Sequence, residues 1–148
     1  MLRQLLVAAA IGACTIRIHA LVMTVVVRTS QATAMKVARR PNLLLIAVMV
    51  ATVSVLMAAH TCEVIVWSLA YDFLAAVPAG TNLLYFAFVN YTTLGYGDVV
   101  PVERWQLLGP ITAMNGVLLF GWSTAVIFEV LRKAMERQRP TTTKDNRI

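Results

Sequence analysis

The chain has 148 residues, of which 59% are hydrophobic, and thirteen Lys or Arg against seven Asp or Glu give a net charge of +6. This apolar content excludes an ordinary soluble domain and indicates membrane spans. The basic residues lie at the edges of apolar runs without interleaved aromatic residues, which argues against nucleic-acid binding. The sequence contains no CxxC, HExxH, P-loop or Ser/His/Asp string, so nothing in it indicates an enzyme.

The first apolar run predicts a transmembrane helix over residues 1–28, because it is long enough to cross about 30 Å of hydrocarbon. A signal peptide is the alternative, and residues 11–14 resemble a lipoprotein cleavage box, but the apolar run continues past the point where such a peptide ends. Arg17 and His19 lie near its middle. A voltage sensor needs arginines at every third position, and this run has one. We expect Cys14 here and Cys62 in the next run to be packed free thiols.

Residues 29–41 form a basic connection that the positive-inside rule places in the cytoplasm. The second apolar run, residues 42–70, predicts another transmembrane helix. Four residues at helical spacing form a stripe along it: His60, Glu63, Trp67 and Tyr71. We expect Glu63 to be buried and to face protein, because a carboxylate facing lipid is costly. Its expected partner is His60, the following short helix or the segment after that helix, and Arg17 is a weaker candidate because the opposite course of the first span places it deeper.

Residues 71–80 predict a short connection, with Pro78 and Gly80 as helix breakers. Residues 81–91 then predict a helix that is too short to span a membrane, with Thr81 as its N-cap. The negative end of this helix dipole points at the segment that follows, which favours a cation there.

That segment, residues 92–98, is too polar and too rich in glycine to be a membrane helix. It reads Thr92, Thr93, Leu94, Gly95, Tyr96, Gly97 and Asp98. Glycine alone adopts a positive φ without strain, so the alternating glycines can turn successive carbonyls to the same side. We expect the carbonyls of Thr93, Leu94, Gly95 and Tyr96 to face one axis. Four chains around that axis would form oxygen cages able to replace the water shell of a potassium ion.

The third apolar run, residues 107–131, predicts a third transmembrane helix, and residues 132–148 form a basic tail. The charge of the tail places the C-terminus in the cytoplasm. Three spans then place the N-terminus and the glycine-rich segment outside, in a multi-pass protein of the cell (inner) membrane.

The Thr93–Gly97 string resembles the selectivity filter of potassium channels, and residues 42–131 resemble the helix–pore loop–helix module of small bacterial potassium channels. The combination with the short first span looks like a small uncharacterised ion-channel family. The resemblance implies an all-α membrane protein with a re-entrant pore helix at 81–91. It also implies an outer helix at 42–70, a turret at 71–80, an inner helix at 107–131 and a four-fold tetrameric pore. Gly116, Gly121 and Thr124 resemble the gate and hinge pattern of its inner helix.

The sequence departs from this pattern behind the filter. Related channels place tryptophans where this chain has Tyr85 and Phe86, and the best-known bacterial channel has a glutamate where this chain has Val89. The filter support must therefore be built differently. We expect Tyr85 to donate to Asp98, with water as the alternative partner of that carboxylate, and Asn90 to meet the Tyr96 hydroxyl. Thr92 and Glu63 complete the expected support.

The sequence therefore predicts a homotetrameric potassium-selective channel in a lipid bilayer, with no cofactor beyond K⁺ ions at Thr93, Leu94, Gly95 and Tyr96. A non-selective cation channel is the nearest alternative, but such channels normally lack the filter tyrosine or the second glycine. A non-conducting membrane assembly subunit is the third. The stimulus that opens the gate cannot be predicted from these residues.

Overall fold

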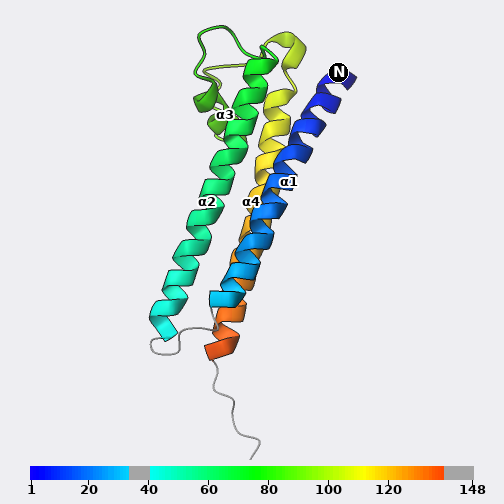
Figure 1. Cartoon of the computed structure of the whole chain (residues 1–148). Coiled ribbons are helices and arrows are strands. Elements are labelled where there is room, and N and C mark those ends of the chain that lie inside the picture. The colour runs from blue at the N-terminus through cyan, green and yellow to red at the C-terminus, as the bar shows by residue number, and fades with distance from the viewer. Residues whose placement is uncertain (34–40, 139–148) are drawn as a thin grey trace, which may run out of the picture.

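The computed structural model describes residues 1–33 and 41–138. These ranges contain four α-helices: α1 (Leu2–Thr33), α2 (Pro41–Phe73), α3 (Leu83–Tyr91) and α4 (Leu108–Gln138). A short 3₁₀ turn, η1 (Glu103–Trp105), precedes α4. The three long helices form a bundle, and the short α3 lies beside one end of α2 (Figure 1).

Three segments are long and apolar enough to cross a membrane: Leu2–Thr29, Leu43–Phe73 and Glu103–Glu136. This confirms the expectation of an all-helical protein with three membrane spans. Helices α1 and α4 run in one direction and α2 in the other (Figure 1). The N-terminus therefore lies at the same end of the bundle as α3, which we call the α3 end, and α4 finishes at the far end.

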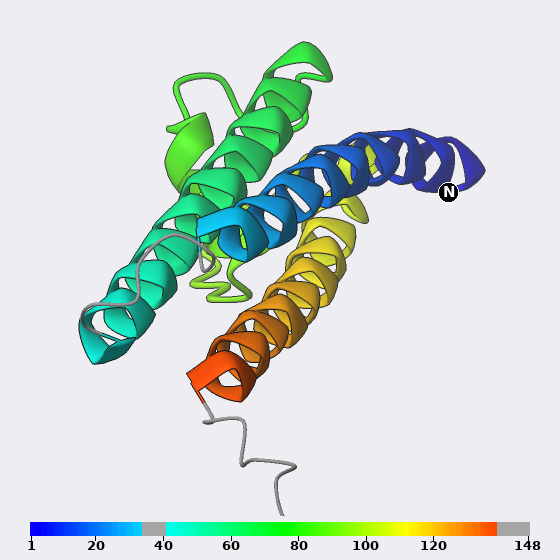
Figure 2. The ribbon, with the colours of Figure 1, turned by 60° about the horizontal axis from the view of Figure 1, so that its bottom comes forward.

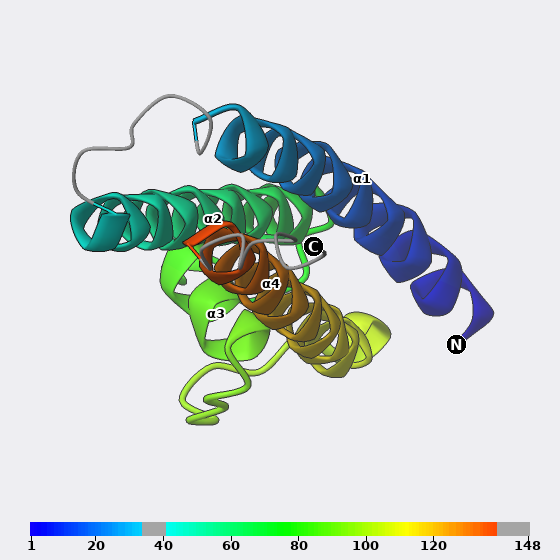
Figure 3. The same ribbon diagram turned by 90° about the horizontal axis from the view of Figure 1, so that it is seen from below.

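Helices α2 and α4 form the centre of the arrangement. Helix α1 runs obliquely across them (Figure 2), and α3 packs on the other side of the same pair (Figure 3). Residues from both outer helices can therefore meet only through side chains that α2 and α4 present between them.

Several predicted boundaries are moved by packing and capping. Helix α2 continues to Phe73 rather than ending at residue 70, and Tyr71 within this extra turn is buried, with its hydroxyl 2.6 Å from the Thr112 hydroxyl of α4. Thr81 is not the N-cap of α3. Asn82 takes that position and accepts a hydrogen bond from the Tyr85 amide at 3.1 Å, whereas the Thr81 hydroxyl donates to the Pro78 carbonyl.

The first and third membrane-spanning helices also extend beyond the C-terminal bounds that the sequence predicts. Helix α1 extends beyond residue 28 to Thr33, and α4 extends beyond residue 131 to Gln138. Ion pairs from Arg132 to Glu129 and Glu136, one turn away on either side, support this added length of α4. Part of the basic tail predicted at 132–148 is therefore helical, and residues 139–148 lie outside the described part of the chain, as do residues 34–40 of the basic connection.

Two hydrophobic clusters hold the bundle together. The cluster at the α3 end is rich in aromatic residues, including Trp67, Tyr71, Phe86, Tyr91 and Trp105. The cluster at the far end is aliphatic and consists of Met23, Val26, Leu56, Val126 and Val130. The two cysteines belong to neither cluster: Cys14 and Cys62 are free, as expected, but exposed rather than packed.

Candidate functional site

The segment of residues 92–98 follows α3 directly and is anchored on its last turn. The Thr93 amide donates to the Asn90 carbonyl at 2.9 Å, and the amides of Leu94 and Gly95 both donate to the Val89 carbonyl at 2.9 and 3.2 Å. These bonds satisfy carbonyls that the end of a helix leaves without intrahelical partners. The C-terminal end of α3 and the start of the segment are therefore one continuous hydrogen-bonded unit.

This anchoring determines where the first carbonyls of the segment point. A trans peptide group is planar, so each C=O is directed opposite to the N–H of the next residue. Because the N–H groups of Thr93, Leu94 and Gly95 point back at α3, the carbonyls of Thr92, Thr93 and Leu94 point away from it. Within the described residues, no hydrogen bond ends on the carbonyls of Thr93, Leu94, Gly95 or Tyr96. These oxygens remain free to act as ligands.

The backbone of the segment alternates in handedness. Gly95 and Gly97 have φ values of 57° and 76°, as the glycine spacing predicts, while the residue before each of them, Leu94 or Tyr96, keeps a negative φ. Thr93 also has a positive φ, of 61°. A β-branched residue in this region is strained by about 1–3 kcal/mol, and such strain is concentrated at functional sites. The alternation thus begins one residue pair earlier than the glycines indicated.

The side chains of the segment are open to the surroundings of the single chain. Leu94 is 54% exposed and Tyr96 is 67% exposed. Hydrogen bonding to the Asp98 carboxylate raises the pKa of Tyr85 above its ordinary value, so these two residues lie close together, as the sequence predicts. No hydrogen bond joins Asn90 to the Tyr96 hydroxyl within the described part of the chain. Its amide nitrogen donates instead to the Phe86 carbonyl at 2.8 Å.

Behind the segment lies a buried polar cluster, which we call the His–Glu cluster. It consists of residues from all four helices, His19 of α1, His60 and Glu63 of α2, Tyr91 of α3 and Ser123 of α4. Glu63 is fully buried, as expected. One of its carboxylate oxygens lies 2.7 Å from His19 Nδ1, and the other lies 3.0 Å from His60 Nδ1 and accepts a hydrogen bond from the Tyr91 hydroxyl.

The rest of the α2 stripe is also turned toward protein. The Trp67 indole N–H donates to Asn115 Oδ1 of α4 at 3.1 Å, and the Thr15 hydroxyl of α1 donates to the same oxygen at 3.0 Å. Together with the Tyr71–Thr112 contact, these bonds form a ladder of buried polar contacts along the α2–α4 interface. Because none of the buried side-chain polar atoms described lacks a partner, the ladder is complete.

Sequence reasoning located the centre of this cluster but missed part of it. The partnership of Glu63 with His60 and with α3 is as expected, whereas Arg17, the weaker candidate, is exposed and forms no ion pair with Glu63. His19, one helical half-turn further on, takes that place. His19, Tyr91 and Ser123 were not singled out as partners, although a second histidine in an apolar run is itself a signal of a buried polar contact.

A model of a family described as an ion channel matches residues 59–133, half of the chain. The chain belongs to this ion channel family. No curated protein and no solved structure matched the chain. The matched region runs from the middle of α2, just before His60 and Glu63, through α3 and the 92–98 segment to residue 133 of α4, and leaves α1 outside. Membership of this family supports passive ion conduction by a multi-pass membrane protein, rather than an enzymatic reaction.

The channel packs α4 closely against the end of α3, at Gly116. A Cβ atom added there would stand 2.0 Å from the Tyr91 carbonyl oxygen, far inside van der Waals contact. Gly121, by contrast, has open space around the equivalent position, and the Thr124 hydroxyl donates to the Phe120 carbonyl of its own helix at 2.9 Å. The close approach of two backbones therefore explains why residue 116 is a glycine. This packing reason is independent of the expected hinge role.

The connection after the 92–98 segment is tied to α1 and to the segment after α2. The Val102 amide donates to the Ala76 carbonyl at 2.9 Å, and the Leu107 amide donates to Gln4 Oε1 at 3.0 Å. The Arg3 guanidinium lies 5.3 Å from the centre of the Trp105 ring, within the range of a cation–π contact. The N-terminal turn of α1 thus braces the channel next to the segment, although α1 lies outside the matched region.

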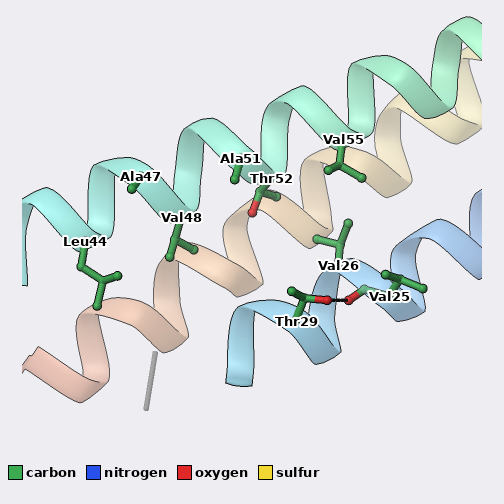
Figure 4. Close-up of a pocket in the computed structure, with 9 residues that line it drawn as sticks. All are labelled: Val25, Val26, Thr29, Leu44, Ala47, Val48, Ala51, Thr52 and Val55. Carbon is green, nitrogen blue, oxygen red and sulfur yellow. Dashed lines mark hydrogen bonds between the residues drawn. The ribbon is translucent and has the colours of Figure 1, made fainter. Parts of the chain in front are cut away.

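The channel also contains an apolar cavity of about 480 Å³ between α1 and α2, toward the far end (Figure 4). No ionisable side chain contributes to its lining, which consists of Val25, Val26, Thr29, Leu44, Ala47, Val48, Ala51, Thr52 and Val55. This lining offers little to a hydrated ion. The ligand chemistry belongs to the α3 end of the molecule.

Proposed function

We propose that the chain is one subunit of a homotetrameric potassium-selective channel. The observation that carries the proposal is the run of unpaired carbonyls on a backbone whose φ is positive at Thr93, Gly95 and Gly97. A potassium ion leaves its water shell only if oxygens surround it on all sides. One chain supplies one side of such a cage, so four copies around an axis are required.

In this proposal, K⁺ binds between successive rings of carbonyls from Thr93, Leu94, Gly95 and Tyr96. The Thr93 hydroxyl adds a ring at the inner end, and the helix dipole of α3 points its negative end at the entering cation. Ions in single file repel one another, which lets them leave as readily as they enter. Thr92 and Asp98 lie at the two ends of the 92–98 segment, and Tyr85 lies beside Asp98.

The apolar surface of the single chain supports assembly into a closed tetramer. Beside the 92–98 segment, α3 and the first half of α4 expose large side chains that include Leu84, Tyr85, Phe88, Met114, Val117 and Leu118. Copies related by a four-fold axis would cover the part of this surface nearest the axis, and lipid would cover the rest. The long helix α1, on the other side of α2 and α4 from α3, would then lie at the periphery (Figure 3).

We further propose that the α3 end faces the outside of the cell membrane and the far end of α4 faces the cytoplasm. Arg132 and Lys133 lie near that far end, where the positive-inside rule expects basic residues. The N-terminus is then outside, at the same end as α3.

The test is ion flux into liposomes that contain the purified protein, with K⁺ or Na⁺ as the only permeant cation, together with native mass measurement of the assembly. We expect a tetramer and a flux that requires K⁺. Gly97→Ala should move the K⁺/Na⁺ reversal potential toward zero or abolish conduction, because a Cβ at a φ of 76° strains the carbonyl arrangement.

Three other outcomes would contradict the proposal. Equal K⁺ and Na⁺ flux through the wild-type protein would favour the non-selective cation channel. A stable tetramer without flux of either ion would favour a non-conducting subunit. Unchanged selectivity in Gly97→Ala would show that these carbonyls do not select the ion.

A further inference from the structure

The His–Glu cluster contains both histidines of the chain, since the sequence has only two. The ionisable side chains that meet here are His19 from α1, His60 and Glu63 from α2 and Tyr91 from α3, while α4 contributes the hydroxyl of Ser123. Because every one of these groups is buried, the number of protons they share is limited by the hydrogen bonds available to them.

On the carboxylate side, each contact requires a donor. His19 Nδ1 lies 2.7 Å from Glu63 Oε1, and His60 Nδ1 lies 3.0 Å from Oε2, which also accepts from Tyr91. His60 Nδ1 is also 2.9 Å from the Tyr91 oxygen, which can only accept from it because the single Tyr91 proton goes to Oε2. An ionised carboxylate only accepts hydrogen bonds, so a bare ring nitrogen in either place would set two lone pairs against each other. We therefore assign a proton to Nδ1 of both histidines and leave Glu63 ionised, with three donors around it.

On the other side, both Nε2 atoms meet a single hydroxyl. Ser123 Oγ lies 2.9 Å from His60 Nε2 and 3.3 Å from His19 Nε2. A hydroxyl has one proton to donate and can accept through its lone pairs. It can therefore donate to one Nε2 while it accepts from the other, which must then carry a proton of its own. Unlike Thr124, whose hydroxyl donates to the Phe120 carbonyl, Ser123 has only the ring nitrogens as partners within the described residues.

The charges lead to the same count. One imidazolium and one carboxylate give the cluster no net charge, which is the least costly state for ionised groups buried in a membrane span. A second imidazolium would lie 5.2 Å away between ring centres, where the two positive charges repel in a poorly polarisable interior. The rings of Phe120 and Trp122, with centres 4.6 Å from His60 and 5.4 Å from His19, can accommodate one cation.

We propose that His19, His60 and Glu63 form a buried proton-binding site of zero net charge, which holds one proton more than a carboxylate and two neutral histidines would. The site binds the Tyr91 hydroxyl, and Tyr91 directly precedes the 92–98 segment. The proton count follows from the cluster alone. Its consequence for the filter, that the ionised Glu63 carboxylate of the site holds the Tyr91 hydroxyl and hence keeps the first carbonyl rings in place, depends on the proposed function.

The test is a direct count of protonated ring nitrogens. The full chain, labelled with ¹⁵N in histidine only and freed of any histidine tag, is reconstituted in lipid vesicles and measured by solid-state NMR. Two rings have four nitrogens, and protonated and bare nitrogens give separate signals. We expect three protonated nitrogens and one bare nitrogen per chain. A ¹³C label in glutamate should show the Glu63 carboxyl ionised.

The matched variants are Glu63→Gln and Glu129→Gln. Without the carboxylate charge, the cluster is neutral with two neutral histidines, so Glu63→Gln should double the bare signal from one to two per chain. Glu129 lies on α4, where it pairs with Arg132 and Lys133 outside the cluster, so its variant should leave the histidine spectrum unchanged.

Two or no bare nitrogens in the wild-type spectrum would overturn the proposal, because the site would then carry a net charge or place its proton elsewhere. One bound zinc ion per chain in the purified protein would also overturn it, since His, His and Glu are zinc ligands and a metal would replace the shared protons. The count is independent of conduction: three protonated nitrogens in a protein without K⁺ flux would keep the site and remove only the proposed function.

Discussion

The two ends of the bundle are built from different interactions. At the α3 end, hydrogen bonds join α1 to α2 and α4, and join α2 to α3 and α4, from Thr15 and Asn115 to the His–Glu cluster. At the far end, an aliphatic cluster lies near an apolar cavity of about 480 Å³, and the ion pairs of Arg132 lie within α4 itself. Hydrogen bonds hold side chains at one distance and angle, whereas aliphatic contacts change little in energy when one helix slides along another.

This difference assigns distinct tasks to the two ends. Selecting an ion requires that carbonyls stay in place, and the polar end carries the 92–98 segment. In the proposed channel, opening and closing a pore requires that helices move, and the aliphatic contacts described at the far end are not directional. The comparison therefore predicts that substitutions at the α3 end reduce the stability of the protein strongly, whereas substitutions at the far end have small effects.

The largest expected effect is that of Glu63→Val. The substitution leaves His19, His60 and Tyr91 with buried polar groups and no common acceptor. Removing one partner of a buried ionic network costs about 3–5 kcal/mol of stability. We therefore expect the variant to lose its folded structure or its K⁺ flux. Thermal melting and flux in liposomes measure it, and Glu63→Gln should retain much of both.

Glu129→Val is the control for this prediction, because Glu129 is paired at the partly exposed far end of α4. Ion pairs of this kind contribute about 0–1 kcal/mol. Equal losses of stability in Glu63→Val and Glu129→Val would remove the distinction between the two ends.

The next effect is that of alanine at the two glycines of α4. Gly116→Ala places a Cβ against the Tyr91 carbonyl, so α4 must move away from α3 and the protein should melt at a clearly lower temperature. Gly121→Ala meets nothing and should raise helix stability by up to about 1 kcal/mol. If both glycines act as hinges instead, the two variants should alter gating alike and leave the melting temperatures similar.

The smallest effect compares one truncation at each end. Val64→Ala removes a fully packed side chain beside the His–Glu cluster and should cost about 2–3 kcal/mol. Val26→Ala only enlarges the existing cavity and should cost about 1 kcal/mol. Melting of the two variants in the same lipid decides between them, and a larger loss for Val26→Ala would contradict the view of the far end as the looser one.

The sequence by itself determined the class of the protein and the course of the chain. Three apolar runs separated by basic or glycine-rich stretches predict three spans, since burying unpaired backbone in lipid is too costly for any other arrangement. The alternating glycines predicted positive φ at Gly95 and Gly97, because only glycine adopts that conformation without strain. The stripe on α2 predicted that Glu63 is buried near His60, because spacing along one helix is local information.

Only the tertiary structure decided which helices meet behind the segment. His19 is 44 residues from Glu63, and Ser123 is 104 residues from His19, so neither contact leaves a trace in local spacing. Arg17 was only the weaker candidate partner of Glu63, and the rotation of α1 against α2 turns it outward and His19 inward. Likewise, the sequence indicates a hinge at Gly116. The tertiary structure shows that a larger residue at this position would collide with the Tyr91 carbonyl.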